Sequence, residues 1–317
     1  MATLLYTPRF EGDVELARLL LTHGAVADAE GSWPAPIVIA IEKGYVDYVD
    51  ALLGGRVSSA TLNAALIAAS RGDELGIAEK LLGHGADPNT VDTHTPLLCA
   101  ALRTRERRPM ALALLVHGAN VNAACGSPSN GPYSPLTLVD KSDHELVDLM
   151  TNRGGQLAIP QHDQDEYESH GVSAGPIVWS IMHDADYLAS KLIARDPHLS
   201  NRECGAVVYA SRFGATLTLV ELFKHGADPN STSEHGISAL MAAAFYDQTS
   251  AMRVLLAQPR IDIGQRTPVH ANLGFFTSLG LEGSRPPLTI GGRTALAYAT
   301  LAGSRNAVTL LADRGAR

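Results

Sequence analysis

The chain of 317 residues contains few cysteines and no long apolar run. It has three cysteines, Cys99, Cys125 and Cys204. Because they are few and odd in number, they do not suggest a disulfide framework, which favours a reducing compartment. No apolar segment reaches the length needed to cross a membrane, and the first residues lack the basic and apolar regions of a signal peptide. We therefore expect a cytoplasmic protein, or a nuclear one, that is neither secreted nor inserted in a membrane.

Basic residues and enzyme motifs are scarce as well. The formal net charge of -8 disfavours nucleic acid as a partner, because binding to a duplex normally needs a basic surface. The sequence has no Walker loop, dinucleotide-binding fingerprint or Gly-x-Ser-x-Gly elbow, and we expect no cofactor. Aromatic residues make up 5% of the chain and hydrophobic residues 45%, with many Ala, Leu and Val, a composition that suits short packed helices.

Two short motifs recur along the sequence. One joins Leu-Leu to His-Gly-Ala and Asp-Pro-Asn, and its best copies are residues 81–89 and 222–230, the latter with Phe223 as its second apolar residue. The other begins with Thr-Pro-Leu, continues with small residues, as at 95–101, and precedes the first. Proline suits the first position of a helix, the glycine ends a helix in the left-handed conformation, and Asp-Pro-Asn forms a turn. Each repeat is therefore predicted to contain two short helices and a turn.

Together the two motifs resemble the ankyrin repeat, and the resemblance covers nearly the whole chain. It implies an all-α solenoid of stacked helix pairs with turns that project sideways. About nine repeats, the first incomplete, would form one domain over residues 1–317 at spacings near the family period of about 33 residues. Insertions at about 156–173 and 264–292 interrupt this period, and such long loops are usually functional or disordered. Because the second is rich in apolar residues, we expect it to fold back onto the protein.

The resemblance gives structural roles to several reactive side chains. The histidines of His-Gly-Ala lie in the last turn of a second helix, where positive charge suits the helix dipole, so we do not interpret them as metal ligands. Cys99 follows Leu97 and Leu98 and is predicted to be a small core residue. The histidines are His23, His84, His117 and His225.

The resemblance also implies a concave face built from the projecting turns and from two residues near the end of each first helix. These residues change from basic to aromatic along the chain, which predicts a groove for an acidic, extended partner with an apolar group. Alternatively, such positions are solvated in any stack of this kind and carry charge without a ligand. The predicted partner-binding residues are Lys43, Arg71, Arg103, Lys141, His183, Arg212, Phe213, Phe245 and Tyr246, with His94 and Tyr133 at the turn tips.

A possible catalytic site surrounds His183, which lies one helical turn from Trp179 and precedes two aspartates. A general base oriented by a carboxylate is conceivable there. Helix capping and turn formation explain Asp184 and Asp186 without any catalysis. The weak catalytic candidates are His183, Arg212 and Tyr246.

The first insertion holds the densest cluster of ionisable residues. Imidazole and carboxylate groups together suit Zn or Mn, although the absence of cysteine excludes a common closed zinc site. A solvated acidic loop explains the same residues, and we favour that interpretation. The weak candidates for metal ligands are His162, Asp163, Asp165 and His170.

The sequence favours a protein-interaction module whose partner is another protein or peptide, or a small anionic ligand. The alternative is a small-molecule-binding protein or non-standard enzyme, with its site in the concave groove beneath the two inserted loops. We interpret the chain as repeats alone and expect no attached catalytic domain, but fold alone does not decide between these functions.

Overall fold

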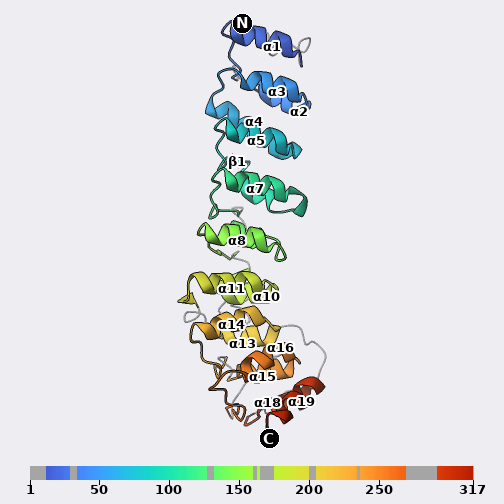
Figure 1. Ribbon diagram of the computed structural model, residues 1–317, viewed down its shortest axis with the longest axis vertical. Helices are drawn as coiled ribbons and strands as arrows, with labels where there is room; N and C mark the ends of the chain where they lie inside the picture. Colours follow the sequence, from blue (N-terminus) through green and yellow to red (C-terminus); the bar gives the residue numbers. More distant parts are fainter. Residues whose placement is uncertain are drawn as a thin grey trace. The chain divides into compact units, whose positions relative to one another are not determined.

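The computed structural model describes residues 12–28, 34–126, 132–159, 163–164, 175–199, 205–233, 236–268 and 291–316. Over these residues the chain is mainly helical, and successive helices pack as pairs (Figure 1). The predicted fold class, an all-α stack of ankyrin-type repeats, is confirmed. The chain divides into two compact units, Met1–Asp140 with Arg153–Leu157 and Lys141–Asn152 with Ala158–Arg317. The expectation of one domain across the chain stays a prediction.

The first unit contains α-helices, two short 3-10 helices and a small antiparallel hairpin. In the hairpin, Asp92 pairs with Thr95, and the exposed residues Thr93 and His94 form the tip with φ angles of 44° and 75°. The elements are α1 (Val14–Thr22), α2 (Pro36–Glu42), α3 (Val46–Leu53), α4 (Ser59–Gly72), α5 (Leu75–Gly83), β1 (Val91–Asp92), β2 (Thr95–Pro96), α6 (Leu97–Ala101), η2 (Arg105–Arg107), α7 (Arg108–Val116) and η3 (Pro135–Leu138).

The second unit is built from two rows of helices. The first helices of its repeats pack in the order α10, α13, α15 and α18, and the second helices pack in the order α8, α11, α14, α16 and α19. The elements are α8 (His144–Asn152), α10 (Pro176–Met182), α11 (Asp186–Arg195), α13 (Ala206–Phe213), α14 (Thr216–Lys224), α15 (Ala239–Phe245), α16 (Thr249–Leu256), α18 (Ala295–Ala302) and α19 (Arg305–Asp313).

The Asp-Pro-Asn segments connect successive repeats as well as forming turns. Within its own turn, the Asp87 carboxylate accepts a hydrogen bond from the Asn89 N–H at 2.9 Å. The Asn89 side-chain oxygen then accepts from the N–H of Asn120 in the next repeat at 2.7 Å. Asn230 repeats this contact in the second unit, where its side-chain oxygen accepts from the Asp262 N–H at 2.8 Å. The last residue of the motif therefore holds adjacent turns together.

Aspartates replace glycine at the ends of several first helices. Asp184 and Asp247 adopt left-handed φ angles of 55° and 52°, where Gly214 has 71°. Asp186 binds the next repeat, because its carboxylate accepts from the N–H groups of Leu217 and Thr218 at 3.0 and 2.8 Å. Asp184 ends its first helix, as the turn interpretation predicted. Asp186 also has a structural role, but it binds the start of α14 in the next repeat and does not cap the helix that it begins.

Two predictions about reactive side chains have different outcomes. The structural role of the motif histidines is confirmed at His23 and His84, whose Nδ1 atoms each lie 2.8 Å from a carbonyl oxygen in the last turn of their own helix. Cys99 is buried in the core, as predicted, but it also forms a disulfide with Cys125, which the sparse cysteines did not suggest. Their Cα atoms lie 5.5 Å apart although 26 positions separate them, since the turn after α7 returns to α6. The spacing of the two cysteines in the sequence does not reveal that the chain brings them together.

Most of both insertions lies outside the described residues, including the segment expected to fold back. The base of the second insertion is described and closed by hydrogen bonds. The Thr267 N–H donates to the Arg293 carbonyl oxygen at 3.0 Å, and the Gly292 N–H donates to the Thr267 carbonyl oxygen at 2.9 Å. The chain therefore leaves and re-enters the stack at one place, so α18 keeps its position beside α15.

Candidate functional site

The predicted basic residues of the first unit lie on its surface, where acidic neighbours offset part of their charge. Lys43, Arg71 and Arg103 are all exposed. Arg71 binds Asp92 through two hydrogen bonds, Nε to Oδ2 at 2.8 Å and Nη2 to Oδ1 at 2.5 Å. The hydrogen bond from Arg71 lowers the pKa of Asp92 below its ordinary value, which keeps the carboxylate charged. This pair weakens the attraction of the first unit for an acidic partner.

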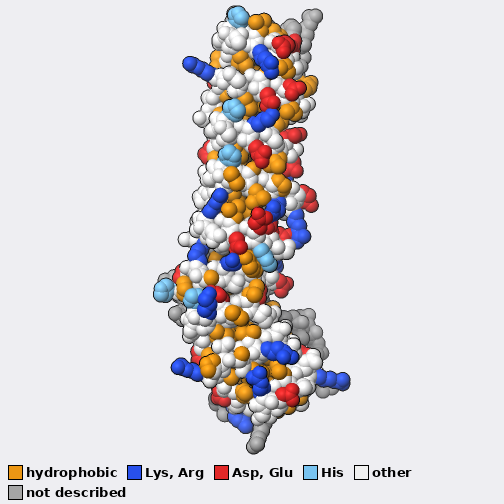
Figure 2. Space-filling model, viewed as in Figure 1, with side chains coloured by type: hydrophobic (Ala, Val, Ile, Leu, Met, Phe, Trp, Pro, Cys, Tyr) orange, Lys and Arg blue, Asp and Glu red, His pale blue; other side chains and the backbone are white. Residues whose placement is uncertain are grey.

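The remaining predicted positions are distributed over both units. His94 is exposed at the hairpin tip, and Tyr133 is half-buried with its carbonyl oxygen accepting from the Cys125 N–H at 2.8 Å. Lys141 is exposed and belongs to the second unit. On the face drawn in Figure 2, acidic and basic side chains are interspersed within each unit. A single basic line along the chain stays a prediction.

The second unit brings Arg212 together with several aromatic rings at the ends of α13 and α15. The Arg212 side chain is buried, with 4% of the residue exposed, whereas the basic line requires an exposed cation. Its guanidinium carbon lies 5.3 Å from the centre of the Phe213 ring and 4.8 Å from that of Tyr246. Tyr246 follows α15 of the next repeat and covers the arginine. This contact joins two repeats, so the sequence of one helix does not reveal it.

The rings continue along the same row of first helices. Phe245 meets Tyr246 edge-on with ring centres 5.1 Å apart, and Tyr298 of α18 lies 6.5 Å from Phe245. Burial lowers the pKa of Arg212 and raises the pKa of Tyr246. The raised pKa keeps the Tyr246 phenol neutral at neutral pH, and an arginine side chain in a protein stays charged there. We call Arg212, Phe213, Phe245, Tyr246 and Tyr298 the aromatic cluster.

His183 contacts a carboxylate that differs from the two following it in sequence. Its Nδ1 lies 2.9 Å from the Trp179 carbonyl oxygen, and its ring stacks on the Trp179 ring with centres 4.1 Å apart. Its Nε2 is 4.0 Å from Oδ2 of Asp163, which accepts a hydrogen bond from the Trp179 indole N–H at 2.7 Å. Asp163 thus connects the first insertion to α10. This arrangement fixes the ring orientation and gives His183 a structural explanation.

The metal hypothesis rests largely on residues outside the described part of the chain. His162, Asp165 and His170 lie outside it, while Asp163 is described and bound to Trp179. Across the described ranges, no three or more His, Cys, Asp and Glu side chains are grouped so as to hold a metal ion. The ligand set predicted from the first insertion stays a hypothesis.

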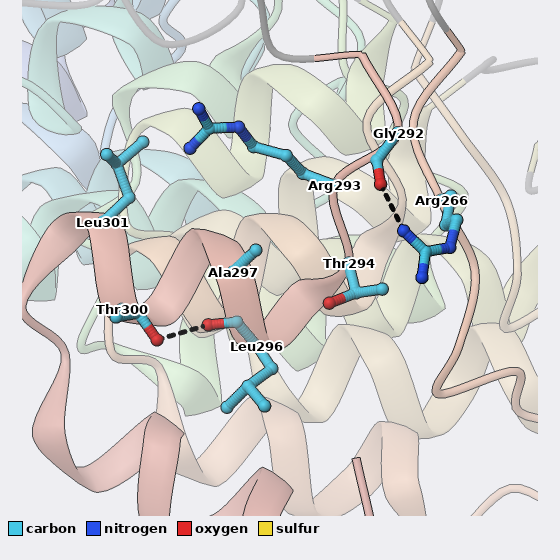
Figure 3. A pocket seen from close by; sticks show the side chains of 8 residues that line it. All are labelled: Arg266, Gly292, Arg293, Thr294, Leu296, Ala297, Thr300 and Leu301. Carbon is cyan, nitrogen blue, oxygen red and sulfur yellow. Dashed lines mark hydrogen bonds between the residues drawn. The ribbon is translucent and has the colours of Figure 1, made fainter. Parts of the chain in front are cut away.

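A hollow of about 510 Å³ lies at the base of the second insertion, against α18 (Figure 3). Arg266 and Arg293 border it, and the Arg266 side chain donates to the Gly292 carbonyl oxygen at 2.7 Å. Figure 3 shows Arg293 extending along the side of α18 that carries Leu301. Among the described residues, those lining the hollow include no acidic side chain; they are Arg266, Gly292, Arg293, Thr294, Leu296, Ala297, Thr300 and Leu301.

The sequence-based reasoning missed the two arginines of this hollow. An Arg-Thr pair lies at each end of the second insertion, Arg266 with Thr267 and Arg293 with Thr294. That repetition is a signal, because the two ends of an insertion between adjacent repeats must return to one place.

No helix in the described part of the chain has both the length and the apolar character needed to cross a membrane.

Comparisons with known proteins identify the repeats most clearly in the second unit. Residues 207–317 match the family model described as ankyrin repeats (3 copies). The chain is also 26% identical over 258 residues to "Ankyrin repeat domain-containing protein SAT10" of Stachybotrys chartarum. This alignment covers 76% of the chain and 12% of that relative, so the chain spans a small part of its length. Ankyrin repeats generally mediate protein–protein interactions; the count of about nine stays a prediction.

Proposed function

We propose that the chain is a protein-interaction module that binds an acidic protein or peptide segment, with the aromatic cluster as its main contact. The observation that carries this proposal is the placement of Arg212 between Phe213 and Tyr246. Arginine and large aromatic side chains are the residue types that most often dominate binding energy at interfaces. Here they converge at the ends of neighbouring first helices, where the resemblance to ankyrin repeats implies a binding face.

The burial of Arg212 assigns different tasks to the members of the cluster. Because 4% of the residue is exposed, Arg212 contributes its charge from beneath the rings and holds them in place. Phe213, Phe245 and Tyr246 are half-buried, so part of each residue remains accessible to solvent. A partner would lay an apolar group on these rings, and a neighbouring carboxylate would be attracted by the guanidinium below. Cation–π contacts of this kind are favourable when they are removed from water.

The basic residues at the surface have a weaker role in this proposal. Exposed like-signed charges mainly raise the rate of association with an oppositely charged partner. Arg71 is already paired with Asp92, so its attraction is reduced. Lys43, Arg103 and Lys141 are expected to steer the partner and to add little binding energy. The turn tips at His94 and Tyr133 would set its register.

The test is affinity capture with the full chain followed by quantitative mass spectrometry. We expect one or more proteins to be lost when Phe213→Ala and Phe245→Ala are combined. The matched control is Leu217→Ala with Val220→Ala, which removes apolar side chains that are 48% and 53% exposed on α14. Proteins retained equally by both double variants would overturn the aromatic cluster as the binding site.

A second candidate function is the binding of a small anionic molecule, and the hollow beside α18 favours it. Its volume of about 510 Å³ lies within the usual range for ligand pockets, about 300–1,000 Å³. Two arginines at its border suit a carboxylate or phosphate group. Isothermal titration with inorganic phosphate and with benzoate tests this function, and no heat of binding to either at millimolar concentration would count against it.

A further inference from the structure

An aspartate of the first insertion lies on the row of first helices in the second unit, one repeat from the aromatic cluster. His183, Phe213 and Tyr246 each directly precede the left-handed residue at the end of a first helix. Because α10 packs against α13 and α13 against α15, these three residues stand at the same place in successive repeats. Asp163 lies beside His183, so the chain places its own carboxylate in line with the aromatic rings.

The Trp179 indole explains why an acceptor is needed at this place. Trp179 is 6% exposed, and the one polar atom of its side chain is an N–H donor. A buried donor that loses its acceptor destabilises the fold, so the indole requires an oxygen here. Oδ2 of Asp163 supplies that oxygen at 2.7 Å. An N–H group binds an ionised acceptor more strongly than a neutral one, which favours a carboxylate over an amide.

His183 strengthens the preference for a carboxylate. Its ring is held by stacking on the Trp179 ring, with centres 4.1 Å apart, and its Nδ1 lies 2.9 Å from the Trp179 carbonyl oxygen. Its other nitrogen, Nε2, lies 4.0 Å from the same Oδ2 of Asp163 that accepts from the indole. An imidazole that carries a proton attracts an anion at that distance. Two side chains of one helix therefore converge on one carboxylate oxygen.

We infer that Trp179 and His183 form a carboxylate-binding subsite, which Asp163 occupies in the free chain and an Asp or Glu side chain of the partner takes over on binding. This inference deepens the proposed function and rests on it, because the partner is the acidic segment that contacts the aromatic cluster. The exchange preserves the contacts of the subsite, since one carboxylate replaces another on the same donors.

The spacing of the repeats determines where the acidic residue lies in the partner. Adjacent packed helices lie about 8–10 Å apart and an extended chain advances about 3.3 Å per residue, which corresponds to roughly three residues. The acidic side chain should therefore lie that far from the apolar side chain that contacts Phe213. Because Asp163 belongs to the same chain, it competes at a high effective concentration, and its removal should raise the affinity for the partner.

The first test removes the occupant and supplies a free carboxylate to the full chain. Nuclear magnetic resonance follows the indole N–H signal of Trp179, which is assigned by its loss in Trp179→Phe. We expect Asp163→Ala to move this signal, and sodium acetate to return it toward its original position, whereas acetamide and sodium chloride do not. Asp313→Ala, at the end of α19 in the other row of helices, is the matched control and should leave the signal where it is.

The second test measures the exchange with a peptide. One synthetic peptide carries a phenylalanine and a glutamate at the spacing given above, and its control has glutamine in place of the glutamate. By fluorescence anisotropy, Asp163→Asn should bind the glutamate peptide about fivefold more tightly than the unaltered chain does, because the competing carboxylate is gone. The affinity for the glutamine peptide should change less. His183→Gln should reduce the difference between the two peptides.

Two results would overturn the subsite. One is a Trp179 signal that acetate leaves unchanged in Asp163→Ala, and the other is an affinity for the glutamate peptide that Asp163→Asn does not raise. Asparagine keeps an oxygen acceptor for the indole, so the peptide measurement decides even if Asp163→Ala destabilises the fold. Circular dichroism of each variant identifies that case.

The subsite and the proposed function fail in different ways. The acetate experiment does not involve the aromatic rings, so adding Phe213→Ala and Phe245→Ala to Asp163→Ala should leave the rescue intact. If acetate rescues the signal while the double ring variant retains every captured protein, only the proposed function fails. If the double ring variant loses a captured protein and Asp163→Asn captures no more of it than the unaltered chain, only the subsite fails.

Discussion

Arg71 and Arg212 occupy the same position in their repeats and have opposite environments. Each lies two residues before the left-handed residue that ends a first helix, Asp73 with φ 59° and Gly214 with φ 71°. Arg71 extends into solvent toward Asp92, whereas Arg212 is covered by two aromatic rings. The repeat fixes where the backbone puts an arginine, but the neighbouring repeat decides whether it becomes a solvated ion or part of a buried cluster.

The largest expected difference between the two units is covalent. Cys99 and Cys125 cross-link the first unit, and a loop of this length stabilises a fold by about 3–4 kcal/mol in the chain-entropy account. Replacing both cysteines with alanine should lower the stability of the first unit by that amount and leave the second unchanged. Unfolding in denaturant, monitored by hydrogen exchange, measures the stability of each unit separately. Three free thiols in protein purified and denatured without reductant would contradict the disulfide and agree with the reducing compartment predicted from the sequence.

The next largest effect separates Arg212 from Arg71 directly. Arg212→Ala leaves a gap between the Phe213 and Tyr246 rings and should cost about 2 kcal/mol, because a buried side chain loses its packing. Arg212→Met, which fills the same space without charge, should restore most of that loss. Arg71→Ala breaks an exposed ion pair and should lower the unfolding midpoint of the first unit much less. Equal losses at the two arginines, measured by chemical denaturation, would break the comparison.

A smaller effect tests what the two units share. Asn89 and Asn230 join successive turns in the same way, so replacing either with alanine should cost about 1 kcal/mol. Asn230 should cost slightly more, because its amide also donates to the Arg260 carbonyl oxygen at 2.7 Å. Thermal melts of the two single variants provide the comparison. A neutral Asn89→Ala would mean that the motif only shapes its own turn.

The smallest effect concerns the titration of Asp92. The hydrogen bond from Arg71 is the largest cause that lowers the pKa of Asp92. The pair therefore stabilises the fold fully at pH values above the ordinary Asp pKa of 3.8. That contribution is lost as the pH falls through the lowered pKa of Asp92. Nuclear magnetic resonance titration of the carboxyl carbon should show a midpoint below 3.8 that returns toward it in Arg71→Ala. An unchanged midpoint would mean that the pair is absent in solution.

The sequence was sufficient for the helices and turns because those are determined by residues close together in the chain. The paired motifs predicted the helix pairs, and the capping interpretation anticipated the left-handed Asp184. Contacts between repeats were harder to predict. Nothing near Arg212 in sequence reveals that Tyr246 covers it, and nothing near Cys99 reveals Cys125. The same limitation applies to Arg266 and Arg293, which line one hollow only because the insertion closes at its base.

The sequence names Phe213, Phe245 and Tyr246 as candidate positions, and their part in binding stays a prediction. The structure places Phe213 and Tyr246 near Arg212, and Phe245 against Tyr246. The sequence predicts the basic residues as equivalent partner-binding positions. The structure distinguishes Arg71, because Asp92 on a hairpin of the next repeat pairs with it. The charge of a helix surface in a repeat protein therefore has to be assessed together with the charged residues of the neighbouring turns.

The most direct test of the central claim compares how much the aromatic rings and the exposed basic residues each contribute to binding of a partner. For a captured partner, surface plasmon resonance should show that Phe213→Ala with Phe245→Ala raises the dissociation rate and weakens affinity about 30-fold or more, as hot-spot residues do. Charge reversal at Arg71, Arg103 and Lys141 together should mainly slow association. The reverse result, tight binding without the aromatic rings and none after the charge reversal, would contradict the aromatic cluster as the main contact.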